Sequence, residues 1–222
     1  DNDRGTIVGR RSFGKGLVQE PIEFSDGSSI RITVARYYTP SGRCIQKPYR
    51  ESDEDYAMDL IKRYEHGEFF SVDSVKQDES EIFKTKSGRI VYGGGGIMPD
   101  IFVAHDTTGY SDYYADIVSK SLINKFSFRF VDSRRSELST LATAAEIEAY
   151  LDRSNVLNLF YDYAQNNGVK RDYTLNEPAR KQIKSVLYGT IIYDSLDMED
   201  YVAFYNLTDI TVQRAVQVLS EN

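Results

Sequence analysis

The sequence predicts an α+β protein with short strands in its first half and helices in its second. To about residue 108, β-branched and alternating apolar residues are separated by glycine- and proline-containing turns, which is typical of strands. Beyond that point apolar residues recur every three or four positions, which is typical of helices. A length of 222 residues with 41% hydrophobic side chains is enough for a real core. We therefore expect two parts, residues 1–108 and residues 109–222.

The strands of the first part are placed by alternation and by their turns. Turns are expected at Ser25-Asp26-Gly27, Pro40-Ser41-Gly42 and Ser87-Gly88. The expected strands are 6–10, 17–24, 29–38, 81–86, 89–92 and 101–104. One amphipathic helix is expected over 55–66 and ends at Gly67, with an apolar face formed by Tyr56, Leu60, Ile61 and Tyr64.

The helices of the second part are placed by their caps. Thr143 and Glu146 form a capping box, Asn176 precedes a helix with Pro178 in its first turn, and Asp209 opens the last helix. The expected helices are 111–124, 144–151, 155–165, 177–191 and 210–219. The side chains expected to be buried are Val156, Leu159, Phe160, Tyr163, Ile183, Val186, Leu187, Ile191, Val212, Ala215, Val216 and Leu219.

Charge separates the two parts of the chain. The net charge is −7, yet residues 1–50 carry +4 and residues 51–222 carry −11. The basic first segment fits an ordinary solvated surface, or a surface that attracts the terminal carboxylate of a peptide. Nucleic-acid binding is not expected, because the chain is acidic overall and has no basic stripe with interleaved aromatic residues. The sequence contains no stretch of 18 apolar residues, the length that predicts a membrane span, so no membrane contact is expected.

Metal and cofactor sites are not expected. Cys44 is the single cysteine, which excludes an internal disulfide and a cysteine-based zinc site. His66 and His105 lie far apart in the sequence, without metal-ligand spacing. The glycines at 93–96 fit either an anion-binding loop or a close approach between backbones, and the absence of a following helix favours the second.

The most informative residues are Lys15, which lies between two glycines, and Gln19 four positions later. An even spacing places both side chains on one face of a strand, which suits a lysine base held by an amide. The pattern Gly9-x-x-x-x-Gly14-Lys15 also matches a phosphate-binding loop up to its last position. That loop needs a serine or threonine next, followed by a helix, whereas here Gly16 precedes a strand that contains Pro21. Nucleotide binding is therefore not expected.

Two blocks of the chain resemble the C-terminal processing peptidases, also called tail-specific proteases. The first runs from Gly5 to about Gln46 and contains Phe13-Gly-Lys-Gly-Leu-Val-Gln19, Tyr37-Tyr-Thr-Pro-Ser-Gly-Arg43 and Ile45-Gln46. The second runs from Gly88 to Val103 and contains Gly93-Gly-Gly-Gly-Ile-Met-Pro-Asp100. The resemblance implies part of a crotonase/ClpP-like protease core, followed by an all-helical C-terminal region that packs on the core or serves a partner.

The same resemblance implies the chemistry. Lys15 would be the base and Gln19 its orienting residue in a Ser-Lys dyad of a serine-type peptidase that cleaves proteins near their C-termini without a cofactor. A lysine amine has an ordinary pKa of about 10.4, so a lysine base must be held neutral, and a glutamine supplies an acceptor without adding charge. Family members act in the bacterial cell envelope, usually the periplasm, on protein or peptide substrates. The resemblance leaves open whether the protein forms a homo-oligomer.

The resemblance also points to a missing residue. In the family the nucleophilic serine precedes the lysine by roughly 25 residues at a helix start, where the helix N-terminus helps to hold an oxyanion. Counting back from Lys15 runs off the chain, and Ser12 is too close to serve. We expect this chain to be the C-terminal part of a protease and to be inactive alone. The alternative is a non-catalytic binding or scaffold module.

Overall fold

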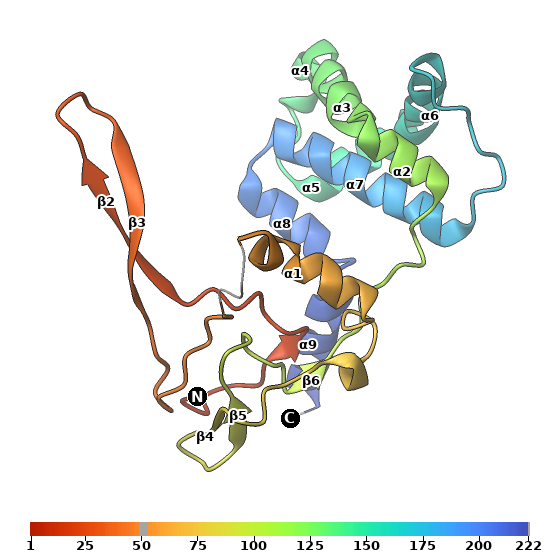
Figure 1. The fold of residues 1–222 in the computed structure, drawn as a ribbon. Helices are drawn as coiled ribbons and strands as arrows, with labels where there is room; N and C mark the ends of the chain where they lie inside the picture. Colours follow the sequence, from red (N-terminus) through yellow and green to blue (C-terminus); the bar gives the residue numbers. More distant parts are fainter. Residues whose placement is uncertain (49–52, 222) are drawn as a thin grey trace. The chain divides into compact units, whose positions relative to one another are not determined.

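The computed structural model describes residues 1–48 and 53–221. It divides into two compact units, Asp1–His105 and Asp106–Asn222, where the sequence predicted a division between residues 108 and 109. The secondary structure confirms the α+β class, with short strands in the first unit and a helical second unit (Figure 1).

The strands of unit 1 form pairs and no larger sheet within its described residues. They are shorter at 6–10, 81–86 and 101–104 than alternation predicted. The pairs are β1 (Val8–Gly9) parallel to β6 (Ile101–Phe102), β2 (Leu17–Glu23) antiparallel to β3 (Ser29–Arg36), and β4 (Ile82–Lys84) antiparallel to β5 (Ile90–Tyr92).

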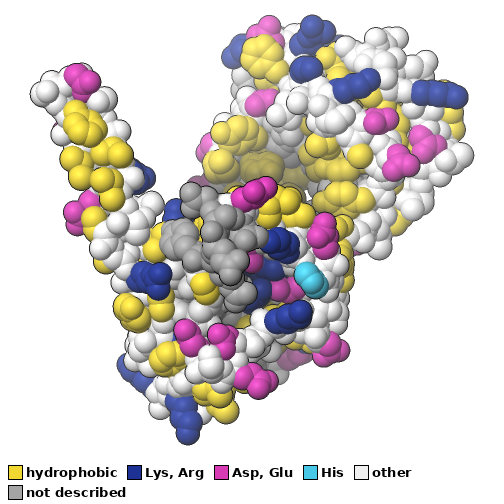
Figure 2. Space-filling model, viewed as in Figure 1, with side chains coloured by type: hydrophobic (Ala, Val, Ile, Leu, Met, Phe, Trp, Pro, Cys, Tyr) yellow, Lys and Arg dark blue, Asp and Glu magenta, His cyan; other side chains and the backbone are white. Residues whose placement is uncertain are grey.

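The β2–β3 hairpin is an arm that projects from the rest of unit 1 (Figure 1). Its turn is the expected one at 25–27, where Gly27 has φ +83° and the Asp26 carboxylate accepts hydrogen bonds from Ser28. Val18 pairs with Ala35 and Ile22 pairs with Ile30, so these side chains share one face of the hairpin. That face is apolar and exposed along the arm, as the hydrophobic side chains in Figure 2 show.

Helix α1 (Asp53–Glu65) confirms the expected helix, which ends before Gly67 at φ +80°. Much of its apolar face is open to solvent. Leu60, Ile61 and Tyr64 are exposed, whereas Arg63 is 6% exposed. The buried Glu68 carboxylate neutralises the Arg63 guanidinium, which explains why a charged side chain takes the inward position. A short 3-10 helix follows at Val72–Ser74.

Unit 1 has little apolar core of its own. Among its described residues Ile45 is the one buried hydrophobic side chain. The other buried side chains are polar or charged: Arg43, Gln46, Lys47, Arg63, Glu68 and Thr85. Hydrogen bonds and ion pairs therefore contribute much of the specific structure of this unit.

The secondary structure of unit 2 is helical within its described residues, and loops connect the helices. The predicted caps are confirmed, since the side chains of Thr143, Asn176 and Asp209 accept hydrogen bonds from the backbone amides that follow them. The helices are α2 (Asp112–Ser119), α3 (Leu122–Ser133), α4 (Arg135–Leu138), α5 (Ala144–Arg153), α6 (Val156–Asn166), α7 (Glu177–Ser195), α8 (Met198–Asn206) and α9 (Ile210–Ser220).

The core of unit 2 is built around α7, which packs against α3, α5 and α8. Its predicted residues Ile183, Leu187 and Ile191 are fully buried, and so are Val156 and Phe160 on α6. Other fully buried side chains of the same cluster are Ile117, Ile147, Leu151 and Ile192.

The sequence prediction for unit 2 has errors and omissions. The predicted helix over 111–124 is two helices, because Ser121 takes a left-handed conformation at φ +53° and α3 continues to Ser133. Helices α4 and α8 were not predicted. Leu159 is exposed, and no side chain of α9 is buried, although Val212 and Ala215 are half-buried. Apolar periodicity shows which side of a helix is apolar, but it does not show how much of that side another element covers.

Candidate active site

The backbone on both sides of Lys15 is held by hydrogen bonds. The Gly14 carbonyl accepts from the Lys47 amide at 2.8 Å. The Gly16 amide donates to Gln46 Oε1 at 2.8 Å, and the Gly16 carbonyl accepts from the Tyr37 amide at 3.1 Å. Both glycines are buried although Lys15 between them is exposed. The lysine side chain therefore extends from a fixed backbone.

The two glycines are required by close packing. Gly14 has φ +86°, and a Cβ there would lie 3.1 Å from the Gly96 amide nitrogen. A Cβ at Gly16 would lie 2.9 Å from Ile45 Cγ1. These approaches explain the Gly-Lys-Gly pattern by backbone geometry, without a phosphate ligand.

Lys15 and Gln19 are both exposed, and among the described residues no hydrogen bond joins their side chains. The Lys15 carbonyl accepts a hydrogen bond from the Tyr37 hydroxyl at 3.2 Å. Gln19 lies opposite Thr33 in the hairpin, and its Nε2 donates to Thr33 Oγ1 at 3.2 Å. The amide nitrogen of Gln19 thus donates to Thr33, and its amide oxygen can accept a hydrogen bond from another donor.

A buried Arg–Glu–Arg cluster holds the segment that leads into Lys15. Glu68 accepts from Arg11 at 2.6 and 2.8 Å and from Arg63 Nε at 2.7 Å. Arg63 also donates to the backbone carbonyls of Arg11 and Ser12. Helix α1 is thereby joined to the residues just before Gly14.

Lys47 forms a second link to α1. Its Nζ lies 3.9 Å from the ring centroid of Phe13 and 4.1 Å from that of Tyr56, within the range of cation–π attraction. The same nitrogen donates to the Tyr56 carbonyl at 2.9 Å and to Asp59 at 3.0 Å. Some of the basic residues in segment 1–50 thus form ion pairs within the protein, namely Arg11, Arg43 and Lys47.

The glycine run at 93–96 packs against neighbouring backbone, as expected. The Gly94 and Gly96 amides donate to the carbonyls of Cys44 and Ile45 at 2.8 and 2.9 Å. The Gly93 amide donates to the Glu81 carbonyl. Three of the run's amides are therefore already used and do not form an anion-binding loop.

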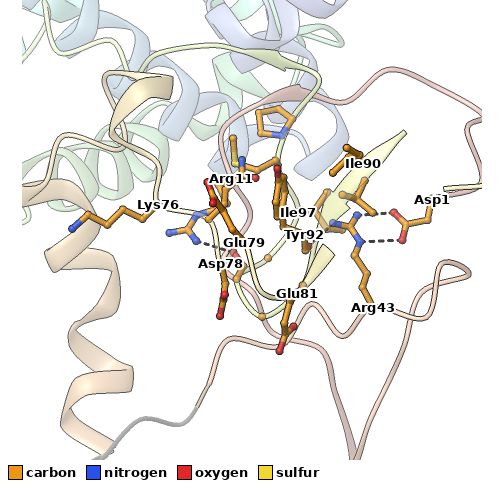
Figure 3. A pocket seen from close by; sticks show the side chains of 18 of the residues that line it. Asp1, Arg11, Arg43, Lys76, Asp78, Glu79, Glu81, Ile90, Tyr92 and Ile97 are labelled. Atoms are coloured by element: carbon orange, nitrogen blue, oxygen red, sulfur yellow. Dashed lines mark hydrogen bonds and ion pairs between the residues drawn. The ribbon is translucent and has the colours of Figure 1, made fainter. Parts of the chain in front are cut away.

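A cavity of about 680 Å³ in unit 1 adjoins this run (Figure 3). Its charged side chains have both signs, and the Arg43 guanidinium there is paired with Asp1 at 2.6 Å. Burial lowers the pKa of Arg43, and the nearby positive charge of Arg89 adds to the effect. Among the described residues no group of three or more His, Cys, Asp or Glu side chains is arranged to hold a metal ion.

Sequence reasoning predicted Lys15 and Gln19 as site residues, and it gave no sign of their neighbours Thr33, Arg63 and Glu68. Thr33 was accessible from sequence, because counting outward from the turn at 25–27 brings it opposite Gln19. The Arg63–Glu68 pair gave no signal, since charged residues on a helix are ordinarily solvated.

Comparison with known proteins bears on the segment that contains Lys15. Residues 1–56 match the sequence model of "Peptidase family S41". Residues 113–197, within unit 2, match a separate family of unknown function, DUF8443.

Individual relatives agree with the S41 match. The chain is 55% identical over 47 residues to the chloroplastic C-terminal processing peptidase of Tetradesmus obliquus, covering 21% of this chain and 10% of that protein. It is 48% identical over 61 residues to the carboxyl-terminal-processing protease of a Synechocystis strain, covering 28% and 14%. It is 37% identical over 71 residues to the carboxy-terminal processing protease CtpA of Bacillus subtilis, covering 28% and 15%.

The matched segments are thus a small part of these relatives, 10% to 15% of their length. No solved structure matches the chain. None of the described helices is both long and apolar enough for a membrane crossing.

Proposed function

We propose that the S41 segment supplies the general base of a serine peptidase that cleaves proteins near their C-termini. In this proposal neutral Lys15 accepts the proton of a serine hydroxyl as that oxygen attacks the substrate carbonyl. The observation that carries it is an exposed lysine on a backbone fixed from both sides by Gly14 and Gly16, within a segment of family S41.

Gln19 has the role of orienting the base. Thr33 Oγ1 accepts from the Gln19 amide nitrogen, which leaves the amide oxygen to accept a hydrogen bond from the Lys15 amine. An amide in this position adds no negative charge, so it does not favour the ammonium form that would be useless as a base. Thr33 is in this account a positioning residue that sets which end of the amide faces Lys15.

The nucleophilic serine is proposed to lie outside residues 1–222, at a helix start in the longer protein. The chain alone is accordingly expected not to hydrolyse peptides, because Lys15 has no serine to activate. A metal or cofactor is not part of the proposed reaction.

The experiment is a turnover measurement with two lysine variants of the longer protein. Lys15→Ala should lower kcat by roughly 100- to 10,000-fold, the range of a general base, with folding near normal. Lys15→Arg should be nearly as inactive, because a guanidinium stays protonated at working pH. Near-normal turnover of either variant would exclude Lys15 as the base, and turnover by residues 1–222 alone would require another nucleophile.

The competing function is a non-catalytic binding or scaffold module. The two are separated by the sequence that precedes Asp1 in the longer protein. A Ser-Ala-Ser-type helix start there supports the peptidase, whereas its absence supports the binding module.

The location proposed for a bacterial source is the cell envelope, most simply the periplasm. The relatives include both bacterial and chloroplastic proteins, so a plastid is the alternative in a photosynthetic eukaryote. Cell fractionation that recovered the longer protein only from the cytosol would contradict the envelope assignment.

A further inference from the structure

The outer edge of β2, which begins two residues after Lys15, has no paired strand among the described residues. Among the described residues β2 pairs with β3 on one side and with no strand on the other. An unpaired strand edge offers a row of amide donors and carbonyl acceptors to another extended chain.

The hydrogen bonds at the two ends of β2 show which residues face that edge. The Gly16 carbonyl accepts from Tyr37 and the Phe24 amide donates to Ser28, so both point toward the β3 side. Backbone groups alternate along a strand, and Gly16 and Phe24 are an even number of residues apart. The register shifts between Val18 and Gln19, but the extra residue, Val34, lies on β3, so the count along β2 holds. Leu17, Gln19, Pro21 and Glu23 therefore direct their backbone groups outward.

Pro21 agrees with this assignment and limits the edge. Proline has no amide hydrogen, and its place in a paired strand is tolerated when the missing donor faces away from the partner. Among the outward-facing backbone groups of β2, the position after Gln19 is Pro21, which therefore offers no amide donor. At the other end the Lys15 carbonyl is already engaged by the Tyr37 hydroxyl at 3.2 Å. The usable donors are those of Leu17 and Gln19.

We infer that the edge of β2 at Leu17 and Gln19 binds an extended peptide segment by strand addition, and that Pro21 ends the pairing. Leu17 follows Lys15 by two residues, about 7 Å along a strand, so a peptide bound there lies beside the proposed base. The choice of a peptide as the occupant rests on the proposed peptidase function. Backbone pairing of this kind depends little on the identity of the peptide's side chains.

The test is an NMR titration of the full 222-residue chain with the peptide acetyl-Thr-Val-Thr-Val-Thr, whose β-branched residues favour an extended backbone. The inference predicts shift changes centred on the amides of Leu17 and Gln19. Leu17→Pro removes one outward donor and should weaken binding at least tenfold. Glu23→Pro removes an outward donor beyond Pro21 and should leave the affinity within twofold of the parent.

Both variants keep the amides that bond to β3, and preserved signals of Val18, Glu20 and Ile22 show that the hairpin is intact. If Leu17→Pro loses these signals, the same peptide with every backbone amide methylated decides the matter, because it has no donor for the Leu17 and Gln19 carbonyls. Equal shifts with the methylated peptide would overturn the inference. Equal weakening by the two proline variants, or no shift at either amide at millimolar peptide, would do the same.

Two other occupants give distinct results. Shifts at Leu17 and Gln19 that depend on protein concentration without peptide would assign the edge to a second copy and overturn the inference. Peptide-induced shifts confined to Ile22, Ile30 and Ile32 would assign binding to the apolar face instead. None of these readouts needs turnover, so a negative result here leaves the Lys15 variants as an independent test of the peptidase proposal.

Discussion

At the scale of single residues, the surroundings of Lys15 are defined by two glycines that other side chains could not replace without strain. Gly14 and Gly16 are held by Lys47, Gln46 and Tyr37, and each glycine has an atom where a Cβ would project. The sequence predicted that Lys15 is special, because the Gly-Lys-Gly pattern and the family resemblance lie in one short segment. It did not predict the contacts that fix the loop, because those join residues 21 to 82 positions apart.

The packing at Gly14 predicts the effect of alanine there. Gly14 and Gly42 both have φ +86°, but a Cβ at Gly42 meets nothing within 4 Å, whereas at Gly14 it meets the Gly96 backbone. Gly42→Ala should destabilise unit 1 by about 1 kcal/mol from the left-handed backbone alone. Gly14→Ala should lower the free energy of unfolding of unit 1 by clearly more than Gly42→Ala does. A urea titration followed by the NMR signals of unit 1 measures both, and equal losses would show that the Gly96 contact is relieved at little cost.

The buried Glu68 predicts a larger loss. Glu68→Gln removes the carboxylate shared by Arg11 and Arg63 and leaves Arg63 with Asp59 alone, 4.0 Å away, which should destabilise unit 1 by about 3 kcal/mol. Glu79→Gln, an exposed carboxylate of the same unit, should change stability by less than about 0.5 kcal/mol. The same titration compares the two variants. A Glu68→Gln chain as stable as Glu79→Gln would mean that water or another anion replaces the carboxylate.

At the scale of elements, caps and turns were predictable and burial was not. The turn at 25–27, the cap at Asn176 and the capping box at Thr143 depend on residues a few positions apart, and each is confirmed. The break at Ser121 was missed because serine gives no strong left-handed signal. The apolar stripe of α9 was misjudged because periodicity is local and burial depends on distant elements.

The contact between α5 and α7 predicts an acid-sensitive step in unit 2. Partial burial disfavours the charged Asp152 carboxylate, but hydrogen bonds from Lys184 and Tyr188 outweigh it and lower the pKa of Asp152 below its ordinary 3.8. A carboxylate whose pKa is lowered by folding stabilises the folded state at any pH above its pKa in the unfolded chain. This stabilisation is lost as the pH falls through the pKa of the carboxylate in the folded state. Unit 2 should therefore lose stability below about pH 4.

Thermal unfolding of the parent and of Asp152→Asn checks this. The variant should unfold at a lower temperature than the parent at about pH 6, and the difference should shrink at about pH 2, where the parent carboxylate is also protonated. Asp132→Asn, in an exposed pair with Arg135, is the matched control and should change little. A difference that stays constant across this range would assign the effect of Asp152 to packing.

At the scale of the whole molecule, the two units differ in how they are stabilised. The buried cluster of unit 2 is drawn entirely from its own residues, whereas unit 1 has one buried hydrophobic side chain among its described residues. Burial of apolar surface is the main favourable contribution to folding. Unit 2 therefore has what an independent domain needs, and unit 1 depends on polar links and leaves an apolar hairpin face exposed.

This contrast predicts separable unfolding. Residues 106–222 expressed alone should be helical and unfold cooperatively, and in the 222-residue chain the NMR signals of unit 1 should disappear at lower urea than those of unit 2. Coincident loss of both sets of signals would show that the units unfold as one. A non-cooperative 106–222 fragment would show that the helical unit needs unit 1.

The central claim is that Lys15 acts as a neutral base whose orientation depends on Gln19. It is tested most directly by pH–rate profiles of the longer protein and its Gln19→Glu and Gln19→Ala variants. A carboxylate at 19 would stabilise the ammonium form of Lys15, so the basic rise of activity should move to higher pH in Gln19→Glu. Gln19→Ala should lower kcat more than it raises KM. A Gln19→Glu profile that overlays the parent's would contradict the claim and leave Gln19 as a hairpin residue that bonds only to Thr33.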